Sequence, residues 1–230
     1  MKIIAHRGAS GYAPENTILA FEKAIEMGAD MIEFDVHALS TGEVVLIHDH
    51  RINRTTNGIG YVSQLSFDGI RRLDAGSGEL VPTLQEVIER VNRRVPINIE
   101  LKGPRSSGAV AKIITHYIRL GWQTSDFLVS SFDHHELLAF KSLMPSIDVA
   151  ALMDALPLEY AAFAERLQAV AVCPGDEFVN EVYVADAHNR GLQVYVWTIN
   201  DPEEMERMAA IGVDGIFTDF PDIARLALKI

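Results

Sequence analysis

Short apolar runs alternate along the chain with longer segments in which apolar residues recur at helical spacing. One such segment carries Leu84, Val87, Ile88 and Val91 on a single helical face. Strand–helix alternation is typical of a parallel sheet, so the pattern predicts an α/β protein. Eight units in 230 residues favour a closed (β/α)8 barrel, with an open doubly wound sheet as the alternative. The predicted strands are Lys2–His6, Met31–Val36, Pro96–Leu101, Phe127–Ser131, Asp148–Met153, Ala169–Cys173, Gln193–Thr198 and Gly215–Thr218.

One apolar run, residues 43–48, breaks this alternation because it follows the second strand too closely for a parallel crossover. It must therefore return antiparallel, through a turn at Thr41-Gly42 in which the glycine supplies a positive φ. The register expected for this hairpin sets His48 directly opposite Asp35, on the same face of the strands.

Residues 49–81 have no clear period and are rich in Gly, Asn, Thr and Ser. We expect a short, loop-rich excursion over the barrel mouth, because long loops in compact domains are often functional. No composition shift or internal repeat divides the chain, so residues 1–230 are expected to form one domain.

The second and third predicted strands carry carboxylates at positions where a barrel strand is normally buried. Alternate residues of a strand share a face, so Glu33 and Asp35 point one way, and Glu100 and Lys102 share a face of the next strand. Three buried carboxylates facing one space would repel one another, and one divalent cation is the simplest compensation. Hard oxygen ligands favour Mg²⁺ or Ca²⁺. The alternatives are a solvated strand face for Glu33 and Asp35, and a simple ion pair between Glu100 and Lys102.

Bulk composition excludes some classes of function. A net charge of −12 argues against a nucleic-acid partner and disfavours an anionic membrane surface. No apolar run approaches the length of a membrane span, and the start of the chain does not resemble a signal peptide. The single cysteine, Cys173, fits a reducing compartment, so we expect a cytoplasmic protein without stable membrane association. Composition says nothing about the oligomeric state.

The candidate catalytic groups all follow or end predicted strands, where the active sites of barrel enzymes lie. His6 and Arg7 end the first strand, and Trp197 lies near the end of the seventh. With His48 as a second imidazole, one ring can accept a proton from a nucleophile and the other can donate one to a leaving oxygen. Arg7, Lys102 and a cation can hold a phosphoryl group, so these parts suit phosphodiester cleavage.

At these positions the chain resembles the glycerophosphodiester phosphodiesterase family. The resemblance is specific because its motifs occur in order over nearly the whole chain, from Ile3 to about Pro221. They are His6-Arg7-Gly8-Ala9-Ser10-Gly11, Pro14-Glu15-Asn16-Thr17, Glu33-x-Asp35-Val36, His48-Asp49, Arg54-Thr55-Thr56-Asn57-Gly58, Pro82-Thr83-Leu84, Glu100-x-Lys102, Ser130-Ser131-Phe132, Trp197-Thr198, Gly212-Val213-Asp214-Gly215 and Thr218-Asp219.

The resemblance implies a TIM barrel with an excursion after the second strand, and one divalent cation, Mg²⁺ or Ca²⁺. It implies hydrolysis of a small glycerophosphodiester, such as glycerophosphocholine, to glycerol 3-phosphate and an alcohol. The implied roles are acid/base catalysis by His6 and His48, metal binding by Glu33, Asp35 and Glu100, and substrate binding by Arg7, Lys102 and Trp197.

Two other functions stay open at this point. A related metal-dependent phospholipase would act on a lysophospholipid or an inositol lipid, and a barrel that had lost its chemistry would serve as a scaffold. Only Gly78-Glu79-Leu80-Val81 separates Ser77 from the Pro82-Thr83-Leu84 motif, where many members carry a longer, aromatic loop. This departure leaves the head-group preference undetermined.

Overall fold

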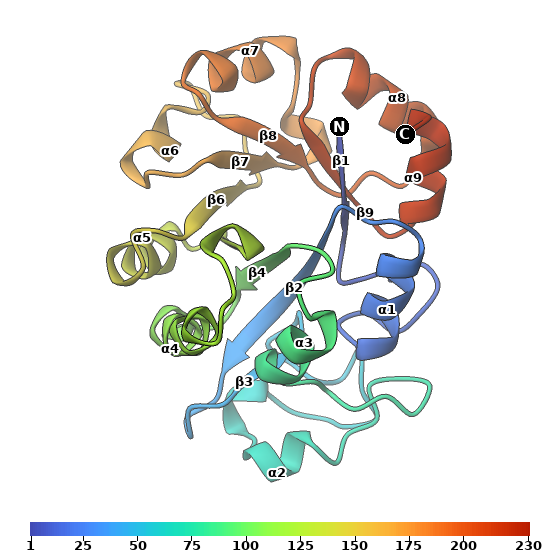
Figure 1. Ribbon diagram of the computed structural model, residues 1–230, viewed down its shortest axis with the longest axis vertical. Helices are drawn as coiled ribbons and strands as arrows, with labels where there is room; N and C mark the ends of the chain where they lie inside the picture. Colours follow the sequence, from blue (N-terminus) through green and yellow to red (C-terminus); the bar gives the residue numbers. More distant parts are fainter.

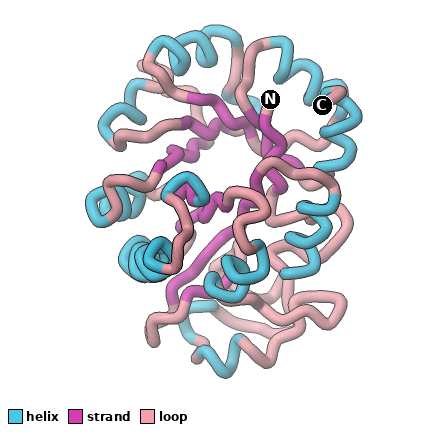
Figure 2. Tube along the Cα trace, in the orientation of Figure 1, coloured by secondary structure: helices cyan, strands magenta, loops and turns pink.

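The computed structural model describes residues 1–230, and eight parallel strands close into a barrel (Figures 1 and 2). The first strand pairs with both the second and the last strand, which closes the sheet. The predicted (β/α)8 barrel is therefore confirmed, and the open doubly wound sheet is wrong. The barrel strands are β1 Lys2–Ala5, β2 Met31–Ala38, β4 Ile97–Leu101, β5 Phe127–Ser131, β6 Asp148–Met153, β7 Ala171–Pro174, β8 Gln193–Val196 and β9 Gly215–Thr218.

Helices surround the strands on the outside of the barrel (Figure 2). Several of them begin after a short polar residue that accepts hydrogen bonds from the free backbone N–H groups of the first turn. Thr83 and Glu86, for example, form a reciprocal capping box at the start of the third helix. No helix has the length and apolar character needed to cross a membrane. The surrounding helices are α1 Ile18–Glu26, α3 Leu84–Val91, α4 Ser106–Arg119, α5 His134–Leu143, α6 Ala162–Arg166, α7 Glu181–Asn189, α8 Pro202–Ala210 and α9 Pro221–Leu228.

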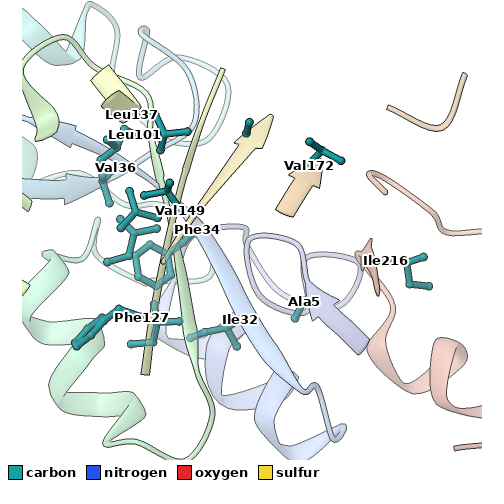
Figure 3. Close-up of a cluster of buried hydrophobic side chains, with 14 of the residues drawn as sticks. Ala5, Ile32, Phe34, Val36, Leu101, Phe127, Leu137, Val149, Val172 and Ile216 are labelled. Carbon is teal, nitrogen blue, oxygen red and sulfur yellow. The ribbon is translucent and has the colours of Figure 1, made fainter. Parts of the chain in front are cut away.

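Strand alternation divides the apolar core into two layers. Residues such as Ile32, Phe34 and Val149 belong to the larger cluster, between the strands and the helices (Figure 3). The alternate strand positions form a smaller apolar cluster in the barrel interior, which includes Leu128 and Phe217. The interior is thus a packed core rather than a channel, and polar side chains inside it stand out.

The antiparallel hairpin is confirmed, but its predicted register is wrong by one residue. Strand β3, Val44–Leu46, pairs with β2 so that Leu46 lies opposite Val36, and the Ile47 N–H donates to the Asp35 carbonyl. Ile47, not His48, is therefore opposite Asp35. The ladder ends at Leu46, so strict alternation no longer governs the next two side chains. Ile47 packs in an apolar cluster outside the barrel, whereas His48 faces the barrel cavity.

The excursion between β3 and α3 lies beside β3 at one edge of the barrel (Figure 1). It contains a short helix, α2 Phe67–Ile70, and a 3₁₀ turn at Val62–Gln64. Val62 and Ile70 pack with Val45 in a cluster separate from the main core. The excursion is thus anchored to the hairpin by its own small apolar core.

Candidate active site

Three carboxylates meet inside the barrel, two from the middle of β2 and one from near the end of β4. The parallel register places Asp35 beside Glu100, with Glu33 two residues earlier on the same face. One oxygen from each of the three lies within 4.8 Å of the others, and the residues are 1–7% exposed. The alternative of a solvated strand face is therefore wrong.

Burial and mutual repulsion shape the charges of these carboxylates. Burial, followed by the charge of Asp35, raises the pKa of Glu100 to about 8 and holds the pKa of Glu33 well above its usual range. Burial opposes ionisation of Asp35 as well, but Arg7, His48 and Lys102 outweigh it and lower its pKa. Glu33 Oε1 and Asp35 Oδ1 accept no hydrogen bond. Such free, hard oxygen atoms fit a divalent cation of the Mg²⁺ or Ca²⁺ type.

Two cationic side chains border the carboxylates. Lys102 Nζ lies 2.8 Å from Glu100 Oε1 and 3.8 Å from Asp35 Oδ1. Arg7 Nε lies 3.2 Å from Asp35 Oδ2, and the Arg7 backbone N–H donates to Glu33. The Glu100–Lys102 ion pair is thus present, but it is part of a larger cluster. Arg7 also pairs with Glu15, so its guanidinium is shared between two carboxylates.

The two predicted catalytic histidines border the same small cavity of about 60 Å³. His6 follows β1 and His48 follows β3. Each has an aspartate oxygen 2.7 Å from Nδ1, provided by Asp219 for His6 and by Asp49 for His48. With the proton on Nδ1, each ring donates to its carboxylate and retains Nε2 for proton exchange. The structure thus brings together every residue that the sequence assigned to the site, and the cavity's lining includes Arg7, Glu33, Glu100, Lys102 and Trp197.

Further hydrogen bonds hold the two aspartates. Asp49 pairs with Arg54, and Asp219 accepts from the Ser10 hydroxyl and the Asn200 amide. Burial opposes ionisation of Asp219, but the hydrogen bond from His6 outweighs it and lowers the pKa to about 2. Arg54 contributes most to lowering the pKa of Asp49. Both groups are therefore carboxylates at neutral pH.

Burial, by contrast, lowers the pKa of His48, although Asp35 and Asp49 favour its charged form. This ring is therefore mostly neutral at neutral pH and able to accept a proton.

Three contacts were not assigned from sequence. The sequence predicts that Asn16 or Thr17 caps the next helix, and Thr17 caps α1, whereas the Asn16 amide donates to Asp35 Oδ2 at 2.9 Å. The carboxylate of Asp219 and the Glu15–Arg54 pair were also missed. Their only sequence signal is their membership of the ordered motifs, because no periodicity places them in the site.

An aromatic wall lies beside the cations. The Trp197 and Phe132 rings meet edge to face, with centroids 5.3 Å apart, and Lys102 Nζ lies 5.5 Å from the Phe132 ring centre. The indole N–H donates to the Cys173 carbonyl, which fixes the Trp197 ring. The cavity therefore has one apolar side and one strongly charged side.

A wider polar hollow, of about 520 Å³, is lined in part by Glu15 and Arg54. Hydroxyl and amide groups of Ser10, Thr56 and Asn57 contribute to its lining, together with Asp74 of the excursion. No aromatic side chain lines it, which agrees with the short loop before Pro82.

Comparison with known proteins gives one consistent result. Residues 6–223 match the model of the glycerophosphoryl diester phosphodiesterase family. The chain is 38% identical to a glycerophosphodiester phosphodiesterase of Bacillus altitudinis, over 97% of this chain and 96% of that one. It is 36% identical to a glycerophosphodiester phosphodiesterase of Caldanaerobacter subterraneus, over 96% and 94% of the two chains. Its fold matches an Oleispira antarctica phosphodiesterase solved with its product sn-glycerol-3-phosphate, with a TM-score of 0.92, 30% identity and coverage of 100% and 97%.

Proposed function

Because this chain belongs to the glycerophosphoryl diester phosphodiesterase family, we propose that its barrel cavity hydrolyses glycerophosphodiesters to glycerol 3-phosphate and an alcohol. One observation carries the proposal: two histidine–aspartate pairs and three clustered carboxylates border a single cavity. Proton transfer groups on two sides of a charged centre suit a reaction that deprotonates a nucleophile and protonates a leaving oxygen.

Glu33, Asp35 and Glu100 would hold one divalent cation, Mg²⁺ or Ca²⁺. When bound, the cation would act as a Lewis acid toward a phosphoryl oxygen. Arg7 and Lys102 lie beside these carboxylates and would bind the remaining charge of the phosphate. Trp197 would contact the carbon skeleton of the glycerol through its ring face.

His6 and His48 would share the proton transfers. Each Nδ1 is engaged by an aspartate, so Nε2 is the atom that would accept a proton from the attacking hydroxyl or donate one to the leaving oxygen. The lowered pKa of His48 favours this ring as the base. Asp49 and Asp219 act through the histidines and are positioning residues.

The polar hollow beside Glu15 and Arg54 would accept a hydroxylated or amine head group. Its hydroxyl, amide and carboxylate groups offer hydrogen bonds, and its apolar lining consists of small side chains such as Ala13 and Ala75, with no large apolar side chain to hold a fatty acyl chain. This favours a water-soluble diester over the lysophospholipid or inositol lipid of the alternative function. We further propose that residues 49–81, which carry Arg54, border the entrance to the site within a single functional unit of residues 1–230. The free, buried Cys173 suits a reducing cytoplasm.

Turnover of glycerophosphocholine, coupled to detection of glycerol 3-phosphate, tests this function. We expect turnover that EDTA abolishes and that Mg²⁺ or Ca²⁺ restores. Equal turnover in EDTA would remove the cation from the proposal. Turnover of lysophosphatidylcholine but of no glycerophosphodiester would favour the phospholipase, and no turnover of either would favour the scaffold.

Glu100→Gln tests the cation site separately from activity. The neutral amide keeps the size of the side chain but removes a negative ligand, so cation affinity measured by calorimetry should fall strongly. Glu43→Gln, on the exposed hairpin turn, is the matched control and should bind like the wild type. Unchanged affinity in Glu100→Gln would show that Glu100 is not a ligand.

A further inference from the structure

Two uncharged polar side chains, Asn98 and Ser130, lie in the barrel interior without any hydrogen-bond partner. Both residues are 0% exposed. Neither the amide nitrogen nor the amide oxygen of Asn98 is paired, and the Ser130 hydroxyl is also unpaired. Buried polar groups in folded proteins nearly always have a partner, so these three atoms require an explanation.

Packing does not explain these two residues. In the strand register Asn98 lies between Glu33 on β2 and Leu128 on β5, which belongs to the interior apolar cluster, and neither residue pairs with its amide. A leucine at position 98 would extend this apolar cluster and leave no unpaired amide in the interior. The adjacent Ser131 shows the usual outcome, because its hydroxyl donates to the Leu101 carbonyl and accepts from the Asp133 N–H.

Both side chains face the carboxylate cluster. In the strand register, Asn98 on β4 lies beside Glu33 on β2, and Ser130 on β5 lies beside Glu100 on β4. Both residues line the small cavity that Glu33 and Glu100 line. Both residues are therefore direct neighbours of the carboxylate cluster.

Resting on the proposed function, we propose that Asn98 and Ser130 hold water molecules in the hydration shell of the cation bound by Glu33, Asp35 and Glu100. An amide both donates and accepts, so Asn98 bonds to a water through its oxygen and to a carboxylate or second water through its nitrogen. Neither residue adds charge to a centre that is already crowded with carboxylates. A cation that keeps part of its hydration shell, as Mg²⁺ does, gains most from such partners.

This role predicts opposite changes in thermal stability and in cation affinity when Asn98 is replaced. Asn98→Leu removes two buried polar atoms that have no hydrogen-bond partner, so the cation-free variant should melt at a higher temperature than the wild type. The same change removes the partner of the cation's water, so Mg²⁺ affinity should fall by about 10-fold to 100-fold, as for other partners of this kind. A merely structural role predicts lower stability and unchanged affinity.

Calorimetric titration with Mg²⁺ and with Ca²⁺, together with thermal melts in EDTA, tests the inference on the full chain. Ser130→Ala is the second variant and should weaken Mg²⁺ binding while keeping the fold, as judged by circular dichroism. Ser131→Ala is its matched control, because this hydroxyl bonds only to backbone groups, and should lower stability without changing Mg²⁺ affinity. We expect the loss of affinity in Asn98→Leu and Ser130→Ala to be larger for Mg²⁺ than for Ca²⁺.

The two proposals fail in different ways. Binding of Mg²⁺ by the wild type but not by Glu100→Gln would support the cation site. If Ser130→Ala and Asn98→Leu then bind Mg²⁺ within about twofold of the wild type, the water-holding role is wrong and the cation site stands. If the wild type binds neither cation, the cation site of the proposed function is wrong, and this inference with it.

Discussion

His6 Nδ1 lies 2.7 Å from Asp219 Oδ1, although 213 positions separate the two residues in the sequence. The contact arises because β1 and β9 are neighbours in the closed barrel, with Ala5 paired to Thr218. Each partner is the residue that directly follows one of these paired positions. The pair therefore depends on closure of the sheet and on no local sequence preference.

Asp219→Asn should lower kcat by about 100-fold while changing KM for glycerophosphocholine little. The amide keeps the shape of the side chain but no longer selects the His6 tautomer that leaves Nε2 free to exchange protons. Steady-state kinetics measure both constants. Asp222→Asn is the control, because that carboxylate accepts only from the exposed Tyr12 hydroxyl, and it should keep wild-type kcat. A wild-type kcat in Asp219→Asn would remove this aspartate from the mechanism.

Asp49→Asn should move the part of the pH–rate profile that reports His48 to lower pH. The Asp49 carboxylate favours the imidazolium, so its loss lowers further a pKa that burial already lowers. The profile of kcat against pH, measured with saturating cation, gives the shift. Asp49→Glu keeps the charge and should restore the wild-type profile in part. A profile that does not move in Asp49→Asn would mean that His48 is not the titrating group.

His48→Ala should lower kcat by about two to four orders of magnitude, the usual contribution of a general acid or base. His50, two residues further along, does not line the cavity and provides the control. His50→Ala should therefore retain nearly the wild-type rate in the same coupled assay. Near-wild-type turnover by His48→Ala would exclude it as the acid or base.

The cation-free protein should lose stability as the pH rises from about 4.5 through about 8. Glu100 has a pKa of about 8 in the folded chain against 4.5 as its ordinary value. Between these pH values the folded state retains a proton that the unfolded state has lost, so raising the pH favours unfolding. Urea denaturation in EDTA at a series of pH values measures this slope, and Glu100→Gln should flatten it.

Mg²⁺ should reverse this decrease of stability with pH, because the ion replaces the protons and binds best to ionised carboxylates. A cation-free stability that rises steadily between pH 4.5 and pH 8 would contradict the raised pKa of Glu100.

At acid pH a different carboxylate limits stability. The pKa of Asp219 is lowered to about 2, so the stabilising contribution of this carboxylate is lost only when the pH falls below the ordinary range of aspartate.

The barrel and its carboxylates could be predicted from sequence because they follow from periodicity. Eight apolar runs that alternate with helical segments predicted the eight barrel strands, and the period of two placed Glu33 and Asp35 on one face. Both predictions depend only on the spacing of residues along the sequence, because alternate residues of a strand lie on the same face. The general rule that barrel enzymes carry their catalytic groups at the C-terminal ends of the strands then predicted which end of the barrel would carry the chemistry.

Contacts formed beyond the ends of strands could not be predicted in this way. His48 reaches the cavity after the hairpin ladder ends. The prediction therefore placed His48 correctly near the carboxylates, but it paired His48 with Asp35, which is wrong. Asn16 has a positive φ of 59° and turns its amide to Asp35 rather than to the helix that Thr17 caps. Asp219 requires the last strand to be in place. Each of these positions depends on the tertiary structure of loops, for which sequence offers no period.

Closure of the barrel by β9 also determines when the protein can first act during its synthesis. A ribosome produces His6 within the opening residues but Asp219 only near the end of the chain. Until that segment has left the exit tunnel, β1 lacks one neighbour and His6 lacks its carboxylate. The nascent polypeptide therefore carries the clustered carboxylates and the His48–Asp49 pair long before it carries the carboxylate that orients His6. Hydrolysis begins only after translation of the final strand.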